Sequence, residues 1–120
     1  MSIGRDLWLT KNCITALPED FGNIRIGNDV RLVDNQIAYL PESLGHMKIH
    51  GDLWLYNNFL TALPESFGNL KVSGNIWIAN NRIVSFPENF RYLDCVGTVY
   101  IGGNPIAETK PKFFGIQIKW

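Results

Sequence analysis

The side chains best suited to nucleophilic or metal chemistry are few in this chain and form no recognisable site. His46 and His50 are four residues apart, but no helix is expected around them and no third ligand repeats nearby. Cys13 and Cys95 have no histidine positioned beside them as a base, which a catalytic thiol needs. The sequence therefore predicts a non-enzymatic protein with no catalytic residue, no metal site and no cofactor.

Three aspartates recur at a fixed interval. Asp6, Asp29 and Asp52 follow one another at 23-residue steps, and Asn75 and Thr98 continue the series. Stacked carboxylates are able to hold Ca²⁺, but the further oxygen ligands that this ion needs are not evident. We expect these carboxylates instead to cap the backbone where a strand begins.

Five large side chains recur at the same interval and form a second series. Its members are Trp8, Arg31, Trp54, Trp77 and Tyr100. Trp, Tyr and Arg are the residues most enriched at binding hot spots. Arg31 would lie between two indole rings, within cation–π reach of both. Tyr56 belongs to the neighbouring column. Together the six side chains predict a binding strip, which we call the aromatic strip; stacking that only stabilises a sheet is an equal alternative.

The same interval runs through the whole chain without an insertion or a deletion. Asparagines follow it at Asn12, Asn35, Asn58, Asn81 and Asn104, and Pro-Glu pairs follow it from Pro18 to Glu88. We therefore expect a single domain over residues 1–120. Its five turns span residues 6–28, 29–51, 52–74, 75–97 and 98–120, and the last is looser than the others.

Each turn has an element pattern that would place these side chains. The alternation Leu7-Trp8-Leu9 has the period of a half-buried strand, so stacked turns should form a parallel sheet. The chain then bends at the asparagine, whose buried amide can bond the free backbone groups of the bend, which predicts a ladder of five asparagines. A short 3₁₀ turn is the most helix expected, around Pro-Glu-Ser-Phe. The inward positions of the first turn are Leu7, Leu9, Ile14, Leu17, Phe21, Ile24 and Ile26.

The repeated pattern L-x-L-x-x-N-x-[IL]-x-x-L-P-x-x-F resembles that of the leucine-rich-repeat superfamily over essentially the whole chain. The variant LPESFGNLKVxGDLWLxxNxL is similar to repeats of short proteins of giant DNA viruses and some bacteria. The resemblance implies a right-handed α/β-type horseshoe solenoid with short parallel strands on a concave face and an irregular or 3₁₀ convex side. It also implies a partner bound on the concave face.

The chain departs from the superfamily pattern before each strand. The usual first leucine would fall at Gly4, Gly27, His50, Ser73 and Val96, whereas the apolar residue comes one position earlier, as at Ile26. A second short strand, pairing through the segments equivalent to residues 24–26, would explain this shift.

The charge balance and the cysteines limit the cellular location and the classes of partner that the sequence predicts. Lys plus Arg and Asp plus Glu both number 11, so a balanced charge favours neither a nucleic-acid nor a membrane partner. No apolar run approaches the ~20 residues of a membrane-spanning helix. Cys13 and Cys95 fall three turns apart, too far for a disulfide. Unpaired thiols without a signal peptide favour a cytoplasmic location, in a host cell if the chain is viral.

The ends of the stack are a second candidate surface. The segment before the first strand, residues 1–5, is too short to cover the first turn, and an uncovered edge strand tends to recruit another chain. Phe113, Phe114 and Trp120 are expected to fold over the last turn as a partial lid.

These observations favour a protein–protein interaction module that binds an unidentified partner through the aromatic strip. The first alternative is a structural, self-assembling protein that forms a homo-oligomer through its uncapped ends. The second is a carbohydrate-binding module, because Trp beside Asp and Asn is a workable platform for a sugar.

Overall fold

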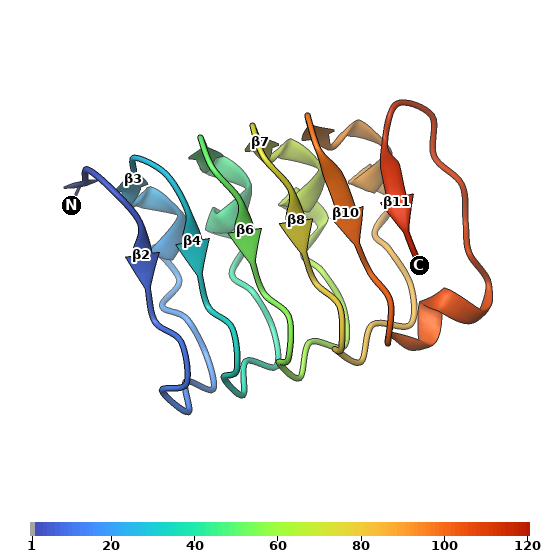
Figure 1. The fold of residues 1–120 in the computed structure, drawn as a ribbon, viewed down its shortest axis with the longest axis horizontal. Helices are drawn as coiled ribbons and strands as arrows, with labels where there is room; N and C mark the ends of the chain where they lie inside the picture. The colour runs from blue at the N-terminus through green and yellow to red at the C-terminus, as the bar shows by residue number, and fades with distance from the viewer. Residues whose placement is uncertain (1) are drawn as a thin grey trace.

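The computed structural model describes residues 2–120 and contains three parallel sheets of short strands joined by 3₁₀ turns (Figure 1). The largest is a six-stranded sheet in the order β11-β10-β8-β6-β4-β2. Its strands are β2 (Leu7–Trp8), β4 (Val30–Arg31), β6 (Leu53–Trp54), β8 (Ile76–Trp77), β10 (Thr98–Tyr100) and β11 (Gln117–Lys119). Each of the first four turns contributes one strand to this sheet, and the last turn contributes two, β10 and β11.

The remaining strands form two smaller sheets on the other side of each turn. β1 (Ser2–Ile3) pairs with β3 (Arg25–Ile26), and β5 (Lys48–Ile49), β7 (Lys71–Val72) and β9 (Asp94–Cys95) pair in that order. The 3₁₀ turns are η1 (Phe21–Asn23), η2 (Glu42–His46), η3 (Glu65–Asn69), η4 (Glu88–Tyr92) and η5 (Pro105–Glu108). The arrangement is consistent with a solenoid-like repeat, and no described segment forms a long helix.

The register of the sheets repeats the sequence interval. Leu7 pairs with Val30 and Leu53 pairs with Ile76, so that each residue meets its equivalent in the next turn. The inward positions of the third turn are all buried, from Leu53 to Val72, because turns cover them on both sides. In the first turn the equivalent residues Leu7, Leu9 and Ile14 are only partly buried. A turn therefore completes its core only when it has two neighbours.

Buried asparagine amides connect each turn to the one before it. The side-chain oxygen of Asn58 accepts the backbone N–H of Ile37 at 3.1 Å, and its amide donates to the Leu32 carbonyl at 2.9 Å. Asn35, Asn81 and Asn104 are buried in the same way and bond the preceding turn equivalently. The predicted ladder of five is wrong at Asn12, which is exposed because no earlier turn of the described chain packs against it.

The residue before each ladder asparagine has a left-handed backbone conformation. Asp34, Asn57 and Asn80 have φ values of 58°, 59° and 55°. Asn and Asp tolerate this conformation because their short polar side chains bond locally. Here the side chains also bond one another, with Asn57 Nδ2 donating to Asp34 Oδ1 at 2.8 Å and Asn80 Nδ2 to Asn57 Oδ1 at 3.0 Å. This second ladder was not predicted from the sequence, although Asp, Asn, Asn and Gly recur there at one repeat position.

The 3₁₀ turns pack on one another through a glycine. A Cβ atom added at Gly68 would collide with the backbone carbonyl of Asn89 in the next turn, and Gly22 and Gly45 face Ser43 and Ser66 in the same way. The fourth residue of this series is Arg91. It is accommodated because residues 111–115, one repeat later, form no 3₁₀ helix that would pack against it.

The predicted second short strand is confirmed, but its sheet is interrupted. Ile3 pairs with Ile26 and Ile49 pairs with Val72, each with its equivalent one repeat later. β3 and β5 nevertheless belong to different sheets, although the backbone N–H of Gly51 still donates to the carbonyl of Asn28 at 3.3 Å beside them.

The last turn does not follow the path of the others. By the repeat interval, Gln117 and Ile118 correspond to β9, yet they pair with Thr98 and Val99 of β10. These partners are closer to one another in the sequence than one full repeat. The segment thus covers the edge of β10 in the six-stranded sheet instead of continuing the sheet of β9.

The predicted C-terminal lid is correct for two of its three residues. Phe113 packs on Phe90, with ring centroids 5.1 Å apart, and Trp120 packs against the core. The prediction is wrong for Phe114, which is 103% exposed. The expectation that residues 1–5 are too short to cover the first turn rests partly on Met1, which lies outside the described residues.

Candidate interaction surface

The aromatic strip lies on the exposed face of the six-stranded sheet. Leu7 and Trp8 are neighbours on a short strand, and their side chains therefore point to opposite faces. Leu7 contributes to the core, whereas Trp8 is 62% exposed. The other members of the strip are half-buried: Arg31, Trp54, Tyr56, Trp77 and Tyr100.

The central side chains of the strip stack on one another across the strands. The rings of Trp54 and Trp77 are 4.8 Å apart at 7°, and those of Trp77 and Tyr100 are 3.9 Å apart at 10°. The guanidinium carbon of Arg31 lies 4.4 Å from the ring centre of Trp8 and 5.0 Å from that of Trp54, which confirms the predicted cation–π contacts. The result is one continuous stack from Trp8 to Tyr100.

Tyr56 stands beside this stack rather than within it. Its ring lies 6.1 Å from that of Trp54 at an interplanar angle of 56°. It therefore widens the strip in the middle with a tilted ring.

A row of carboxylates runs along one side of the stack, at the start of the strands. Oδ1 of Asp6 accepts the backbone N–H of Asp29 at 2.9 Å, and Oδ1 of Asp29 accepts that of Asp52 at 2.7 Å. Asn75 and Thr98 continue the chain of contacts. These bonds confirm that the aspartates cap the strand starts, since each satisfies a backbone donor of the next turn.

The second oxygen of each aspartate binds the stack itself. Oδ2 of Asp6 accepts the indole N–H of Trp8 at 3.1 Å, and Oδ2 of Asp52 accepts that of Trp77 at 3.0 Å. The bond from the Asp29 backbone N–H, followed by that from the Trp8 indole, lowers the pKa of the Asp6 carboxyl below its ordinary value. Each of these carboxylates thus bonds both the backbone of the next turn and a side chain of the aromatic strip.

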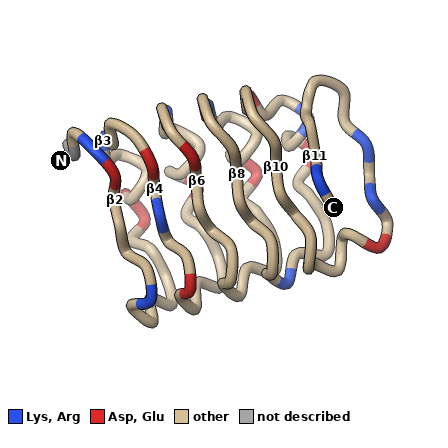
Figure 2. The backbone as a smooth tube through the Cα atoms, viewed as in Figure 1, with Lys and Arg blue, Asp and Glu red and all other residues tan. Residues whose placement is uncertain are grey.

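Charge on this face is unevenly distributed (Figure 2). Acidic positions precede β2, β4 and β6 at one margin, and Arg31 lies next to them on β4. β8 and β10 carry no charged residue, and β11 ends in Lys119. The surface therefore changes from acidic near β2 to aromatic and basic near β11.

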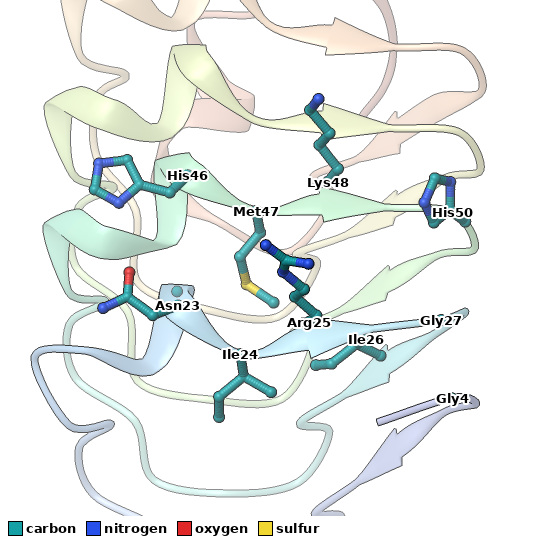
Figure 3. A pocket seen from close by; sticks show the side chains of 11 residues that line it. Gly4, Asn23, Ile24, Arg25, Ile26, Gly27, His46, Met47, Lys48 and His50 are labelled. Carbon is teal, nitrogen blue, oxygen red and sulfur yellow. The ribbon is translucent and has the colours of Figure 1, made fainter. Parts of the chain in front are cut away.

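A hollow of about 620 Å³ lies on the other side of the molecule, where β3 and β5 are neighbours but do not pair with one another (Figure 3). Its apolar floor includes Ile24 and Met47, and Arg25 and Lys48 line it as well. His46 and His50 lie at opposite ends of β5 with their rings well apart (Figure 3). The two histidines that drew attention in the sequence are therefore not brought together.

The two thiols lie in different environments. Cys13 is exposed, Cys95 is half-buried in β9, and both are free, as the sequence predicted. Burial raises the pKa of the Cys95 thiol, and the negative charges of Asp52 and Asp94 act in the same direction. The geometry thus disfavours the thiolate at Cys95, the form that a nucleophile requires.

No protein-family model and no curated protein matches the chain. Among residues 2–120, no helix is long and apolar enough to cross a membrane.

The column that contains Trp8 and Tyr100 extends to one residue that the repeat pattern did not predict. Lys119 pairs with Tyr100 in register, so that it follows Tyr100 in the same column. The repeat interval could not have shown this, because β11 joins the sheet at a different offset.

Proposed function

We propose that this chain is a leucine-rich-repeat solenoid that acts as a non-enzymatic protein–protein interaction module. The constant pairing offset of one repeat, the buried asparagine ladder and the 3₁₀ turns support the repeat assignment. On this proposal the five turns form a right-handed horseshoe, and the face of the six-stranded sheet is the concave, partner-binding side. The free thiols Cys13 and Cys95 support an intracellular setting, in the cytoplasm or in a host cell.

The observation that carries the proposed function is the position of the aromatic strip. The core is filled by the inward side chains of the strands, such as Leu53 and Ile76, and the strip lies on their opposite face. Stacked rings with a trapped guanidinium form a rigid surface, and rigid Trp, Tyr and Arg side chains lose little entropy when a partner binds. A protein partner that presents apolar side chains with a basic group opposite Asp6 fits this surface best, because the carboxylate of Asp29 is already paired with Arg31.

The test is affinity capture from the native cell with wild type and a Trp54→Ser/Trp77→Ser variant. The matched control is Tyr92→Ser/Phe114→Ser, which removes two aromatic side chains that are 69% and 103% exposed outside the strip. A partner retained by wild type and the control but lost by the Trp54/Trp77 variant supports the proposal. Equal capture by all three proteins, each shown to be folded by circular dichroism, would leave stacking as the role of the strip.

Self-association through the ends is the second candidate function. Within residues 2–120, the outermost strands of the six-stranded sheet, β2 and β11, each have one side without a paired strand. Leu7, Leu9 and Ile14 are partly exposed at the first end, because no earlier turn covers them. Light scattering over a range of concentrations separates this function from the first, because a strictly monomeric protein contradicts it.

A carbohydrate platform is supported less well. A sugar stacks on the free face of a ring, whereas Trp54 and Trp77 cover each other. Both oxygens of Asp29 and Asp52 already accept hydrogen bonds within the chain. A glycan array is the direct test.

A further inference from the structure

The column of large side chains on the six-stranded sheet begins and ends on edge strands. Trp8 lies on β2 at one edge, and Lys119 lies on β11 at the other. Lys119 is in register with Tyr100 and is exposed. Because parallel partners in register point to the same face, its ammonium group belongs to the exposed face that carries the strip.

The first end of the column has a free aromatic face. The guanidinium of Arg31 covers one face of Trp8 at 4.4 Å, and the indole is nevertheless 62% exposed. β2 has no neighbour on the side away from β4 in the described chain. Trp8 therefore offers its second face at an open edge of the sheet.

Within the chain, a cation already lies between two aromatic rings of this column. Arg31 places a cation between the indoles of Trp8 and Trp54, at 4.4 and 5.0 Å. At the far edge, Lys119 has an aromatic neighbour on one side, Tyr100, and in the described chain no strand pairs with β11 on the other side. A second copy would supply the missing ring, since its Trp8 is the next aromatic residue in the same column.

We propose that copies of this chain join head to tail, with β11 of one copy pairing in parallel with β2 of the next and Lys119 lying against Trp8 of that copy. The proposal rests on the second candidate function, self-association, and specifies its joint. All strands of the six-stranded sheet are parallel, so the joint continues the sheet without a change of direction. The pairing would satisfy the backbone groups left free on both edges.

Apolar side chains at the two ends match one another. Leu7 and Leu9 are partly buried at the β2 end, and Ile118 and Trp120 are partly buried at the β11 end. The joint would remove both groups from water, which favours association. Because the two contact surfaces differ, the contact does not close on itself, and the expected product is a series of oligomers rather than a fixed dimer.

The experiment measures mass against concentration for the 120-residue chain by sedimentation velocity. Wild type is expected to grow in mass with concentration, and both Lys119→Glu and Trp8→Ser should weaken association about tenfold, the scale of one lost cation–π contact. Lys119→Trp should preserve association, because a ring facing Trp8 stacks as Trp54 and Trp77 do. Lys112→Glu is the control, with the same charge change at another exposed position near the C-terminus.

A covalent variant tests the register. Asp6 and Gln117 occupy the same column of the extended sheet, so that Asp6→Cys/Gln117→Cys, with the native cysteines replaced by Ser, should form ladders of disulfide-linked chains on oxidation. A matched Asp6→Cys/Lys112→Cys protein should not.

The outcomes separate the proposed contact between Lys119 and Trp8 from self-association in general. A protein that stays monomeric at every concentration overturns both. Association that is unchanged in Lys119→Glu and in Trp8→Ser overturns the joint and leaves self-association through another surface. Circular dichroism of each variant verifies its fold, and neither side chain belongs to the buried core.

Discussion

The guanidinium of Arg31 donates to Oδ2 of Asp29 at 2.9 Å, so that Asp29 is not free to accept the indole N–H of Trp54 from the next turn. One repeat later, the equivalent oxygen of Asp52 accepts the indole N–H of Trp77. The N–H of Trp54 is buried and has no acceptor among the described residues, and the same holds for Nε of Arg31. A single arginine in a tryptophan column thus leaves two donors unsatisfied.

Replacing Arg31 by Trp should therefore stabilise the protein. The change exchanges two cation–π contacts for two aromatic stacks of similar strength and frees Asp29 for the Trp54 indole, for a gain of about 1 kcal/mol. Urea denaturation measures the difference, with Arg31→Ala as the control that loses its contacts without replacement. A lower unfolding midpoint for Arg31→Trp than for wild type would refute this account of the stack.

Asparagines at the same repeat position should differ in their contribution to stability. Asn58→Ala leaves the N–H of Ile37 and the carbonyl of Leu32 without a side-chain partner in the core, which should cost about 3 kcal/mol. Asn12→Ala is the matched control and should cost about 0.5 kcal/mol or less, because Asn12 is exposed. Chemical denaturation of both proteins is the measurement. Equal losses would show that the amide acts within its own turn rather than between turns.

Adding a methyl group at Gly68 should disrupt the packing of the 3₁₀ turns. The new Cβ would meet the backbone carbonyl of Asn89, which cannot rotate away as a side chain would, and we expect a loss of about 3 kcal/mol. Arg91→Ala, one repeat later, should change stability by less than about 0.5 kcal/mol, since Arg91 is exposed. Thermal unfolding of the two variants compares them, and a Gly68→Ala protein as stable as wild type would contradict the tight stacking.

The Asp6 carboxylate should make stability depend on acid pH. Its pKa is lowered first by the bond from the Asp29 backbone N–H and then by the Trp8 indole. A group with a folded-state pKa below its unfolded value, about 3.9, contributes stability above that value and loses it as the pH falls through the folded pKa. Unfolding measured from about pH 5 down to pH 2 should therefore show a smaller decline for Asp6→Asn than for wild type. Asn75 already accepts the equivalent backbone bond, from Thr98, so the variant should remain folded.

Much of the site could be predicted from the sequence because the chain repeats itself at one interval. Once Leu7 and Leu9 are taken as inward, Trp8 must face outward, and each repeat step places the next side chain beside it. The cation–π position of Arg31 and the capping role of the aspartates followed from this step alone. Local patterns were also sufficient for the 3₁₀ turns after proline.

Contacts that require a neighbouring turn were decided only by the tertiary structure. Asn12 and Asn58 occupy equivalent positions in the repeat, but only Asn58 has an earlier turn to bond, so only Asn58 is buried. Gln117 aligns with Asp94 in the sequence, yet it pairs with Thr98 in the six-stranded sheet. Arg31 takes the Oδ2 atom of Asp29 and the indole N–H of Trp54 has no acceptor in the described chain, which no repeat pattern shows. A repeat determines the contacts between its interior units, because each unit meets the same neighbours; at the ends, and wherever a residue departs from the pattern, three-dimensional packing makes the choice.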